Sequence, residues 1–248
     1  MFHFLFCVCC CVLAGGACAD EWWTWATLDF WRAKPFTGSV FLGNRWDFDE
    51  GAVVQIASPR LKCELSPWLD AGLGLSLLNL GFPVAADQHL QGRPELELNP
   101  HWALGANLRL DWRNRMEWRW NEGSGPTVHR SRHRLQLGWT LPEPVGPLTR
   151  VFISNEWLLD LHGHGWTENR LVPAGLTLKL SPRADLDCFY LLVSARPAAV
   201  WRSESVLGTH LRYRLLAASA ARTQPRYGNA SPRQRGQGLN WPARSGRV

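Results

Sequence analysis

The feature that most constrains this chain is a regular alternation of apolar residues with polar or small ones, which begins after residue 20. Between Trp102 and Trp112 every second residue is Trp, Leu or Ala, and the residues between them include Asn107, Arg109 and Asp111. The same phase continues as far as Trp120. A period of two is the signature of a β-strand with one apolar face. We expect one long strand here, well beyond the five or six residues typical of soluble sheets.

Similar segments recur along the chain, separated by turns that contain proline, serine or glycine. The segments 61–65 and 69–77 flank Ser66-Pro67 and predict a hairpin. Further alternating segments lie at 130–141, 149–159, 174–180, 186–194 and 209–215, with a proline-rich turn at 142–147. We expect about 10–12 strands, with short turns alternating with longer connections at 81–93, 121–129 and 162–168.

No segment after residue 19 can form a transmembrane helix. The longest uncharged run, 71–86, is interrupted by Pro83 and falls short of the roughly 20 apolar residues required. Only helices and closed barrels satisfy every backbone group in lipid. Short turns at one end, longer loops at the other and tryptophans near strand ends are typical of outer-membrane barrels.

We therefore predict an all-β fold, an antiparallel transmembrane β-barrel of about 10–12 strands spanning residues 20–216. An even number of strands would bring both ends of the barrel to its periplasmic side. A secreted, soluble β-sandwich binding module would show the same alternation and is the alternative fold.

Both ends of the chain differ from this central region. Residues 1–19 lack Lys, Arg, Asp and Glu, are rich in apolar residues and end in Ala17-Cys18-Ala19, which predicts a signal peptide cleaved by an A-x-A rule. Lipidation of Cys18 is the alternative. Residues 217–248 contain six arginines, no acid and almost no large aliphatic residue, and we expect a disordered basic tail. Since residues 1–216 hold equal numbers of basic and acidic groups, the net charge of +6 does not indicate nucleic-acid binding.

Only Cys63 and Cys188 remain after removal of the signal peptide. Two cysteines cannot form a disulfide scaffold for a chain of this size. We expect them to be small apolar side chains on a barrel face, with a single bridge as the alternative.

Several short segments in a fixed order resemble the bacterial domain of unknown function 2490 family. These segments are 113–120, 130–135, 154–157, 169–171 and 174–176. The resemblance covers about residues 21–216 and implies an outer-membrane barrel of this length, without an established activity. The long basic tail departs from the family pattern, in which the chain ends near its last aromatic strand.

Charged residues gather on the polar face of the central strands. The predicted lumen charge network comprises Arg109, Arg113, Arg115, Glu117, Arg119, Arg130, Arg132, Arg134, Glu156 and Arg170. Because charged side chains are costly in lipid, they must point inward. We expect Arg115, Glu117, Arg119, Arg132 and Glu156 to form one connected set. A salt-bridged ladder filling a narrow lumen is the favoured interpretation, and an anion-selective channel or polar ligand site is the alternative.

Two further groups of residues could carry chemistry. His162 and His164 could supply half of a metal site, but no third ligand is identifiable, and we expect a solvated loop and no metal. Ser154, Glu156 and either His162 or His164 could form the nucleophile, acid and base of an outer-membrane lipid hydrolase. No catalytic motif positions the serine, so we expect neither enzymatic activity nor a cofactor.

These observations favour an outer-membrane protein acting as a passive channel or a structural component of the envelope. Its expected partners are outer-membrane lipid and the barrel-assembly machinery, with no nucleic acid.

Overall fold

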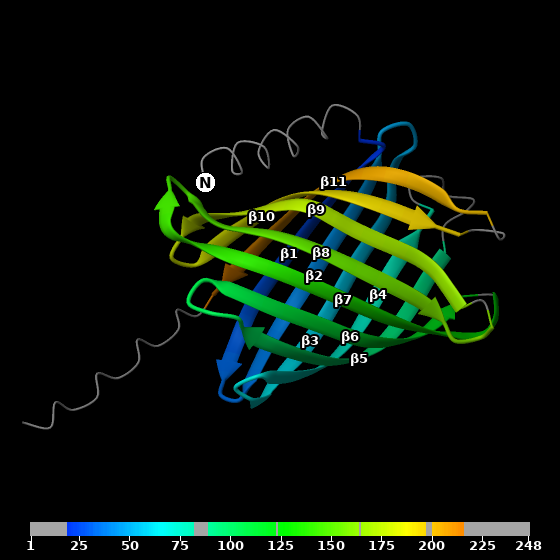
Figure 1. The fold of residues 1–248 in the computed structure, drawn as a ribbon. Helices are drawn as coiled ribbons and strands as arrows, with labels where there is room; N and C mark the ends of the chain where they lie inside the picture. Colours follow the sequence, from blue (N-terminus) through cyan, green and yellow to red (C-terminus); the bar gives the residue numbers. More distant parts are fainter. Residues whose placement is uncertain (1–18, 82–88, 123, 164, 197–199, 216–248) are drawn as a thin grey trace, which may run out of the picture. The chain divides into compact units, whose positions relative to one another are not determined.

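The computed structural model describes residues 19–81, 89–122, 124–163, 165–196 and 200–215, and in this part of the chain every regular element is a β-strand (Figure 1). The strands are β1 (Glu21–Ala33), β2 (Phe36–Asp47), β3 (Gly51–Ser66), β4 (Leu69–Leu80), β5 (His89–Ala103), β6 (Leu108–Asn121), β7 (Ser124–Val145), β8 (Leu148–Asp160), β9 (Gly165–Ser181), β10 (Ala184–Ala195) and β11 (Arg202–Arg214). None of the described residues forms a helix long and apolar enough to cross a membrane. The predicted signal peptide and basic tail lie almost wholly outside the described residues.

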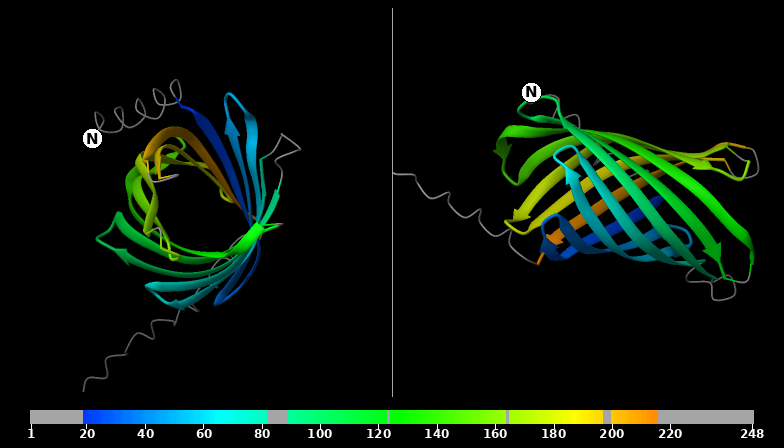
Figure 2. Two further views of the ribbon diagram at one scale, coloured as in Figure 1. Left: turned by 90° about the vertical axis from the view of Figure 1, so that its right-hand side faces the viewer. Right: turned by 90° about the horizontal axis from the view of Figure 1, so that it is seen from below.

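The strands close into a barrel, seen nearly end-on in the left view of Figure 2. Each strand pairs antiparallel with the next one along the chain, which confirms the predicted antiparallel barrel of 10–12 strands. The hairpin predicted around Ser66-Pro67 is formed by β3 and β4. A closed barrel also shows that the alternative fold, a β-sandwich, is wrong.

The barrel closes through a parallel pair, β1 with β11. Their register runs from Glu21 opposite Val206 to Asp29 opposite Arg214. Eleven strands are found in the described residues, so β1 starts at the end of the barrel where β11 also starts, and β11 finishes at the opposite end. The expectation of an even-stranded barrel with both ends on one side is therefore wrong.

The single long strand expected through residues 102–120 is also wrong. β5 ends at Ala103 and β6 begins at Leu108, and the N–H of Leu104 donates to the carbonyl of Leu108 at 2.8 Å across the turn. Gly105 adopts a φ of 134°, which side-chain-bearing residues rarely adopt. Because four residues separate the two strands, the alternating pattern keeps its phase through the turn and hides it from a periodicity argument.

Three of the connections are shorter than the sequence indicated. β5, β7 and β9 begin at His89, Ser124 and Gly165, inside segments expected to be loops. The proline-rich segment 142–147 likewise belongs to β7 as far as Val145. The physical reason is that ladder hydrogen bonds need only the backbone, so polar and glycine-rich segments extend the hairpins beyond the apolar part of each strand.

The two faces of the wall have opposite chemistry. Large apolar side chains point outward, and Leu73, Leu77 and Trp120 expose 59%, 48% and 60% of their surface. Charged side chains of the same strands point inward, where Arg115 exposes 5% and Glu117 exposes none. The alternation therefore sorts lipophilic groups to the outside and charge to the inside.

Candidate functional site in the barrel lumen

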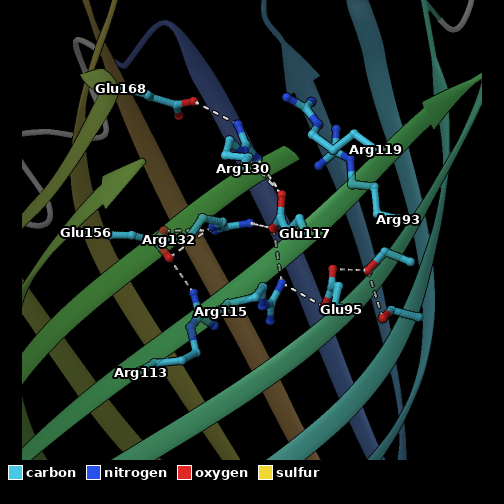
Figure 3. A network of polar contacts seen from close by, with 12 residues as sticks. Arg93, Glu95, Arg113, Arg115, Glu117, Arg119, Arg130, Arg132, Glu156 and Glu168 are labelled. Carbon is cyan, nitrogen blue, oxygen red and sulfur yellow. Dashed lines mark hydrogen bonds and ion pairs between the residues drawn. The ribbon is translucent and has the colours of Figure 1, made fainter. Parts of the chain in front are cut away.

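Glu117 is the centre of the charges inside the barrel. It projects from β6 among three arginines, with Arg132 Nη1 at 2.9 Å, Arg130 Nη2 at 3.0 Å and Arg115 Nη1 at 3.7 Å from its carboxylate oxygens (Figure 3). The strand register explains the arrangement, because β6 and β7 pair Glu117 with Arg130 and Arg115 with Arg132. Like charges opposite each other repel, and a carboxylate between them is stabilising.

Glu156 of β8 is the second centre. Arg132 Nη2 lies 2.9 Å from Glu156 Oε2 and Arg113 Nη2 lies 2.6 Å from Glu156 Oε1. Arg170 of β9 reaches the same carboxylate at 4.0 Å. Arg132 therefore bridges the two buried glutamates with its planar fork, a role that lysine could not take.

A third group extends the charges to β3. Arg115 lies 3.0 Å from Glu95 and 2.5 Å from Glu97, both on β5, and Arg60 of β3 lies 3.1 Å from Glu95. Arg60 reaches past the intervening strand β4 at Gly74, where an added Cβ would lie 3.3 Å from Glu95 Oε2 and 3.4 Å from Arg60 Cγ. The absence of a side chain at this position leaves the space in which Arg60 and Glu95 meet.

Not every predicted member joins these groups. Within the described residues Arg119 has no carboxylate within 4.0 Å and donates instead to Gln91 Oε1 at 3.3 Å. The expected connected set is therefore wrong in Arg119, since β6 carries it beyond Glu117 toward the end of the barrel. Arg109 lies near the other end and pairs with Asp111 at 2.7 Å. Arg134 forms no ion pair with any described residue.

Sequence reasoning missed several inward-facing charges. They are Arg60, Arg93, Glu95, Glu97, Glu168, Asp187 and Arg212. The signal for two of them was present, because Glu95 and Glu97 alternate with Leu96 and Leu98 in the same way as the charges of β6. The connection expected at 81–93 overlaps the start of β5, which begins at His89 and carries Glu95 and Glu97.

The inner surface near the closing pair is apolar. Its buried residues, which we call the apolar wall, are Trp23, Phe152, Val172, Phe189, Leu191, Val193 and Val206, with Trp25 packed against them. Phe189 lies over Gly208, where an added Cβ would lie 2.1 Å from the ring. The apolar wall therefore covers the inside of the β1–β11 junction.

The charges around the middle of the lumen do not balance. The arginines of this region are Arg60, Arg93, Arg113, Arg115, Arg119, Arg130, Arg132, Arg134, Arg170 and Arg212, and its carboxylates are Glu95, Glu97, Glu117, Glu156, Glu168 and Asp187. This group, which we call the charged wall, carries four more positive than negative charges. Such an excess attracts anions to the lumen.

The structure separates the serine and glutamate of the alternative hydrolase site from His162, one of its two candidate histidines. Ser154 and Glu156 point into the lumen, whereas His162 lies in the connection after β8 and accepts a hydrogen bond from the N–H of His129 at 3.2 Å. Asp160, at the end of β8, lies six positions after Ser154, which corresponds to about 20 Å along the strand. His164 lies outside the described residues, and among those described no three His, Cys, Asp or Glu residues gather as a metal site would require.

Cys63 and Cys188 are both unpaired in the structure. They lie on β3 and β10, which are separated by β2, β1 and β11 around the barrel. The alternative of a single bridge between them is therefore wrong, because the strands lie several spacings of about 4.8 Å apart.

Comparison with known proteins gives two matches. The family model described as "Protein of unknown function (DUF2490)" matches residues 21–204. Among solved structures, an anion-selective porin from Comamonas acidovorans is 14% identical, with a TM-score of 0.37, and the match covers 70% of this chain and 55% of the porin. The chain thus spans about half the length of that porin. No curated protein matches the sequence.

Proposed function

The chain belongs to the DUF2490 family of proteins of unknown function, and we propose that it is an outer-membrane β-barrel whose lumen admits small anions in preference to cations. Membrane insertion is supported by the arrangement of side chains in the barrel wall. Large apolar side chains are exposed on its outer face, and charged side chains are buried inside the barrel. A soluble protein rarely exposes apolar surface on this scale. In a membrane the same surface would contact the apolar chains of the lipid.

The preference for anions follows from the charged wall. Ten inward arginines face six carboxylates, and Arg93, Arg119 and Arg134 have no carboxylate within 4.0 Å among the described residues. Small anions would be attracted and small cations repelled. In barrels of eight strands, side chains fill the interior, whereas porins of sixteen strands enclose an open channel. A barrel of eleven strands lies between these sizes, so we expect a narrow pathway.

In this proposal the partners are outer-membrane lipid and the barrel-assembly machinery, and the barrel has no catalytic role. The signal peptide expected in residues 1–19 would export the chain across the inner membrane.

Insertion is tested by replacing an outward-facing residue. Leu75→Arg places a charge on the outer face of β4 and should lower the free energy of unfolding in lipid vesicles by about 2 to 4 kcal/mol if Leu75 lies near the midplane. Leu104→Arg, in the turn between β5 and β6, is the matched control and should cost about 1 kcal/mol or less. Equal effects, or a chain that stays soluble without detergent and does not change mobility on heating in a detergent gel, would disprove insertion.

Ion preference is tested in planar bilayers with a potassium chloride gradient. The reversal potential should show that chloride is the more permeant ion. Arg134→Glu and Arg119→Glu together should shift the potential toward cation preference, whereas the double variant Arg32→Glu and Arg183→Glu, with exposed residues near the barrel end, should not. Cation preference in the unmodified barrel, or no measurable current, would refute the proposed anion preference.

A further inference from the structure

The lumen contains a cavity of about 310 Å³ between the charged wall and the apolar side of the barrel. Its lining residues include eight arginines: Arg60, Arg93, Arg113, Arg115, Arg132, Arg134, Arg170 and Arg212. The carboxylates that line it are Glu95, Glu156 and Asp187. The volume lies at the lower end of the range for small-molecule sites.

Three arginines of this cavity have an unused donor. The Nε atoms of Arg113, Arg134 and Arg212 are buried and donate to no acceptor in the described structure. Buried donors are nearly always paired, and leaving one unpaired is unfavourable. Arg113 and Arg212 each hold one carboxylate through Nη2, at 2.6 Å and 2.9 Å, whereas Arg134 holds none among the described residues. The cavity therefore offers donors and positive charge without a matching acceptor.

The same cavity has an apolar side. It is lined by Trp25, Phe41, Ile56 and Leu78, which lie on β1 to β4. Most of the lining arginines lie on β6, β7 and β9. The rings of Trp25 and Phe41 lie 6.1 Å apart, and His210 packs edge-on against both at 6.0 Å. His210 is fixed by a 2.8 Å hydrogen bond to the hydroxyl of Thr27. The cavity therefore has an aromatic, apolar side and a side on which guanidinium groups keep unused donors.

We infer that this cavity binds a small organic carboxylate, with its anionic group on Arg134 and Arg113 and its aryl or alkyl group on Trp25 and Phe41. A planar guanidinium recognises a carboxylate through paired hydrogen bonds, and charge-assisted bonds of this kind are the strong ones. The apolar part of the ligand would displace water from the aromatic side. The inference adds a ligand class to the proposed anion preference, but it requires only the closed barrel.

Three small probes separate the contribution of the carboxylate from that of the ring. Phenylacetate carries both charge and ring, phenylacetamide has the ring without the charge, and acetate has the charge without the ring. Isothermal titration of the detergent-purified barrel should give phenylacetate at least ten-fold tighter binding than either of the others, and saturation-transfer NMR should show contact with the ring protons. Equal affinities for phenylacetate and phenylacetamide, or for phenylacetate and acetate, would overturn the inference.

Variants test the assigned residues. Arg134→Met should weaken phenylacetate at least ten-fold, and Trp25→Leu should weaken phenylacetate while leaving acetate unchanged. Arg109→Met, at the pair with Asp111 near the barrel end, should leave the affinity unchanged. Because Arg134 holds no carboxylate, its replacement leaves no acid uncompensated, and heat-dependent gel mobility checks that each variant is folded. Unchanged binding by folded Arg134→Met would overturn the assignment.

The two proposals fail in different ways. A barrel that floats with vesicles and passes chloride but does not bind phenylacetate refutes the ligand site alone. A barrel that binds phenylacetate in detergent but does not insert into vesicles refutes the membrane channel alone.

Discussion

Most of the charged wall lies on β5 to β8, and the apolar wall lies on β8 to β11 and β1. Both belong to the same inner surface, but they stabilise it by different means. On the charged wall each buried glutamate needs particular arginines at particular distances, as Glu117 has in Arg130 and Arg132. On the apolar wall Leu191 and Val206 are buried through packing with no directional requirement. The comparison indicates that the charged wall is specific and sensitive to loss of a partner, whereas the apolar wall tolerates changes that conserve volume.

Their positions around the barrel follow the same division. The parallel pair β1–β11 is slightly less stable per residue than an antiparallel pair. The apolar wall lies directly over this junction and adds hydrophobic burial where the ladder is weakest. Most of the charged wall lies on antiparallel strands away from this junction, which hold their register without such help.

The largest expected effect is on the charged wall. Glu117→Ala leaves Arg130 and Arg132 with an uncompensated charge and should lower the free energy of unfolding by about 3 to 5 kcal/mol. The measurement is urea unfolding in the presence of lipid vesicles. Glu122→Ala, at an exposed position beyond the end of β6, is the control and should cost well under 1 kcal/mol. Equal midpoints for the two variants would show that Glu117 is not a centre of the charges.

The apolar wall should respond less strongly to truncation. Leu191→Ala removes a side chain that exposes 2% of its surface, and the cavity left behind should cost about 2 to 4 kcal/mol in the same assay. Its neighbour Leu192 points to the opposite face of β10. Leu192→Ala should cost less, about 1 kcal/mol, because lipid refills the space. A larger loss at Leu192 would reverse the assignment of inner and outer faces.

Added volume should distinguish the walls in a third way. Gly208→Ala on β11 would place a Cβ 2.1 Å from the buried Phe189 ring and should cost about 1 to 3 kcal/mol by overpacking. Gly72→Ala on β4 meets nothing closer than 3.5 Å and should change stability by less than about 0.5 kcal/mol. Thermal unfolding in detergent measures both, and equal shifts would show that the apolar wall is not tightly packed.

The smallest expected effect concerns the contact between Asp20 and Ser205, near the starts of β1 and β11. The N–H and hydroxyl of Ser205 donate to Asp20 at 2.7 and 3.0 Å, which lowers the pKa of Asp20 below its usual range. A lowered pKa stabilises the fold above the unfolded value of about 3.9, and this contribution disappears as the pH falls through the lower folded value.

Asp20→Asn should therefore reduce stability by a few tenths of a kcal/mol at pH 6, and by less at pH 3. Asp49→Asn, in the exposed turn after β2, is the control and should show no such difference. A gap between wild type and Asp20→Asn that does not narrow on acidification would contradict the role of this contact.

The outward and inward faces of the strands could be predicted from the sequence, because a strand shows its side chains to two sides in turn. The phase of Leu73 and Leu77 against Gly74 and Ser76 is correct, as is that of Trp118 against Glu117. Parity also predicted that Glu117, Arg132 and Glu156 face the lumen together. Local periodicity determined these features, since they depend only on neighbours along one strand or one hairpin.

Only the tertiary structure decided how the barrel closes and which charges remain unpaired. The parallel register of Glu21 with Val206 joins residues far apart in the sequence, and no local pattern encodes it. Arg60 meets Glu95 across a third strand, and Arg134 has no carboxylate, because pairing depends on strand order and on the space left at Gly74. Alternation determines the side to which a residue points, and closure determines what it meets there.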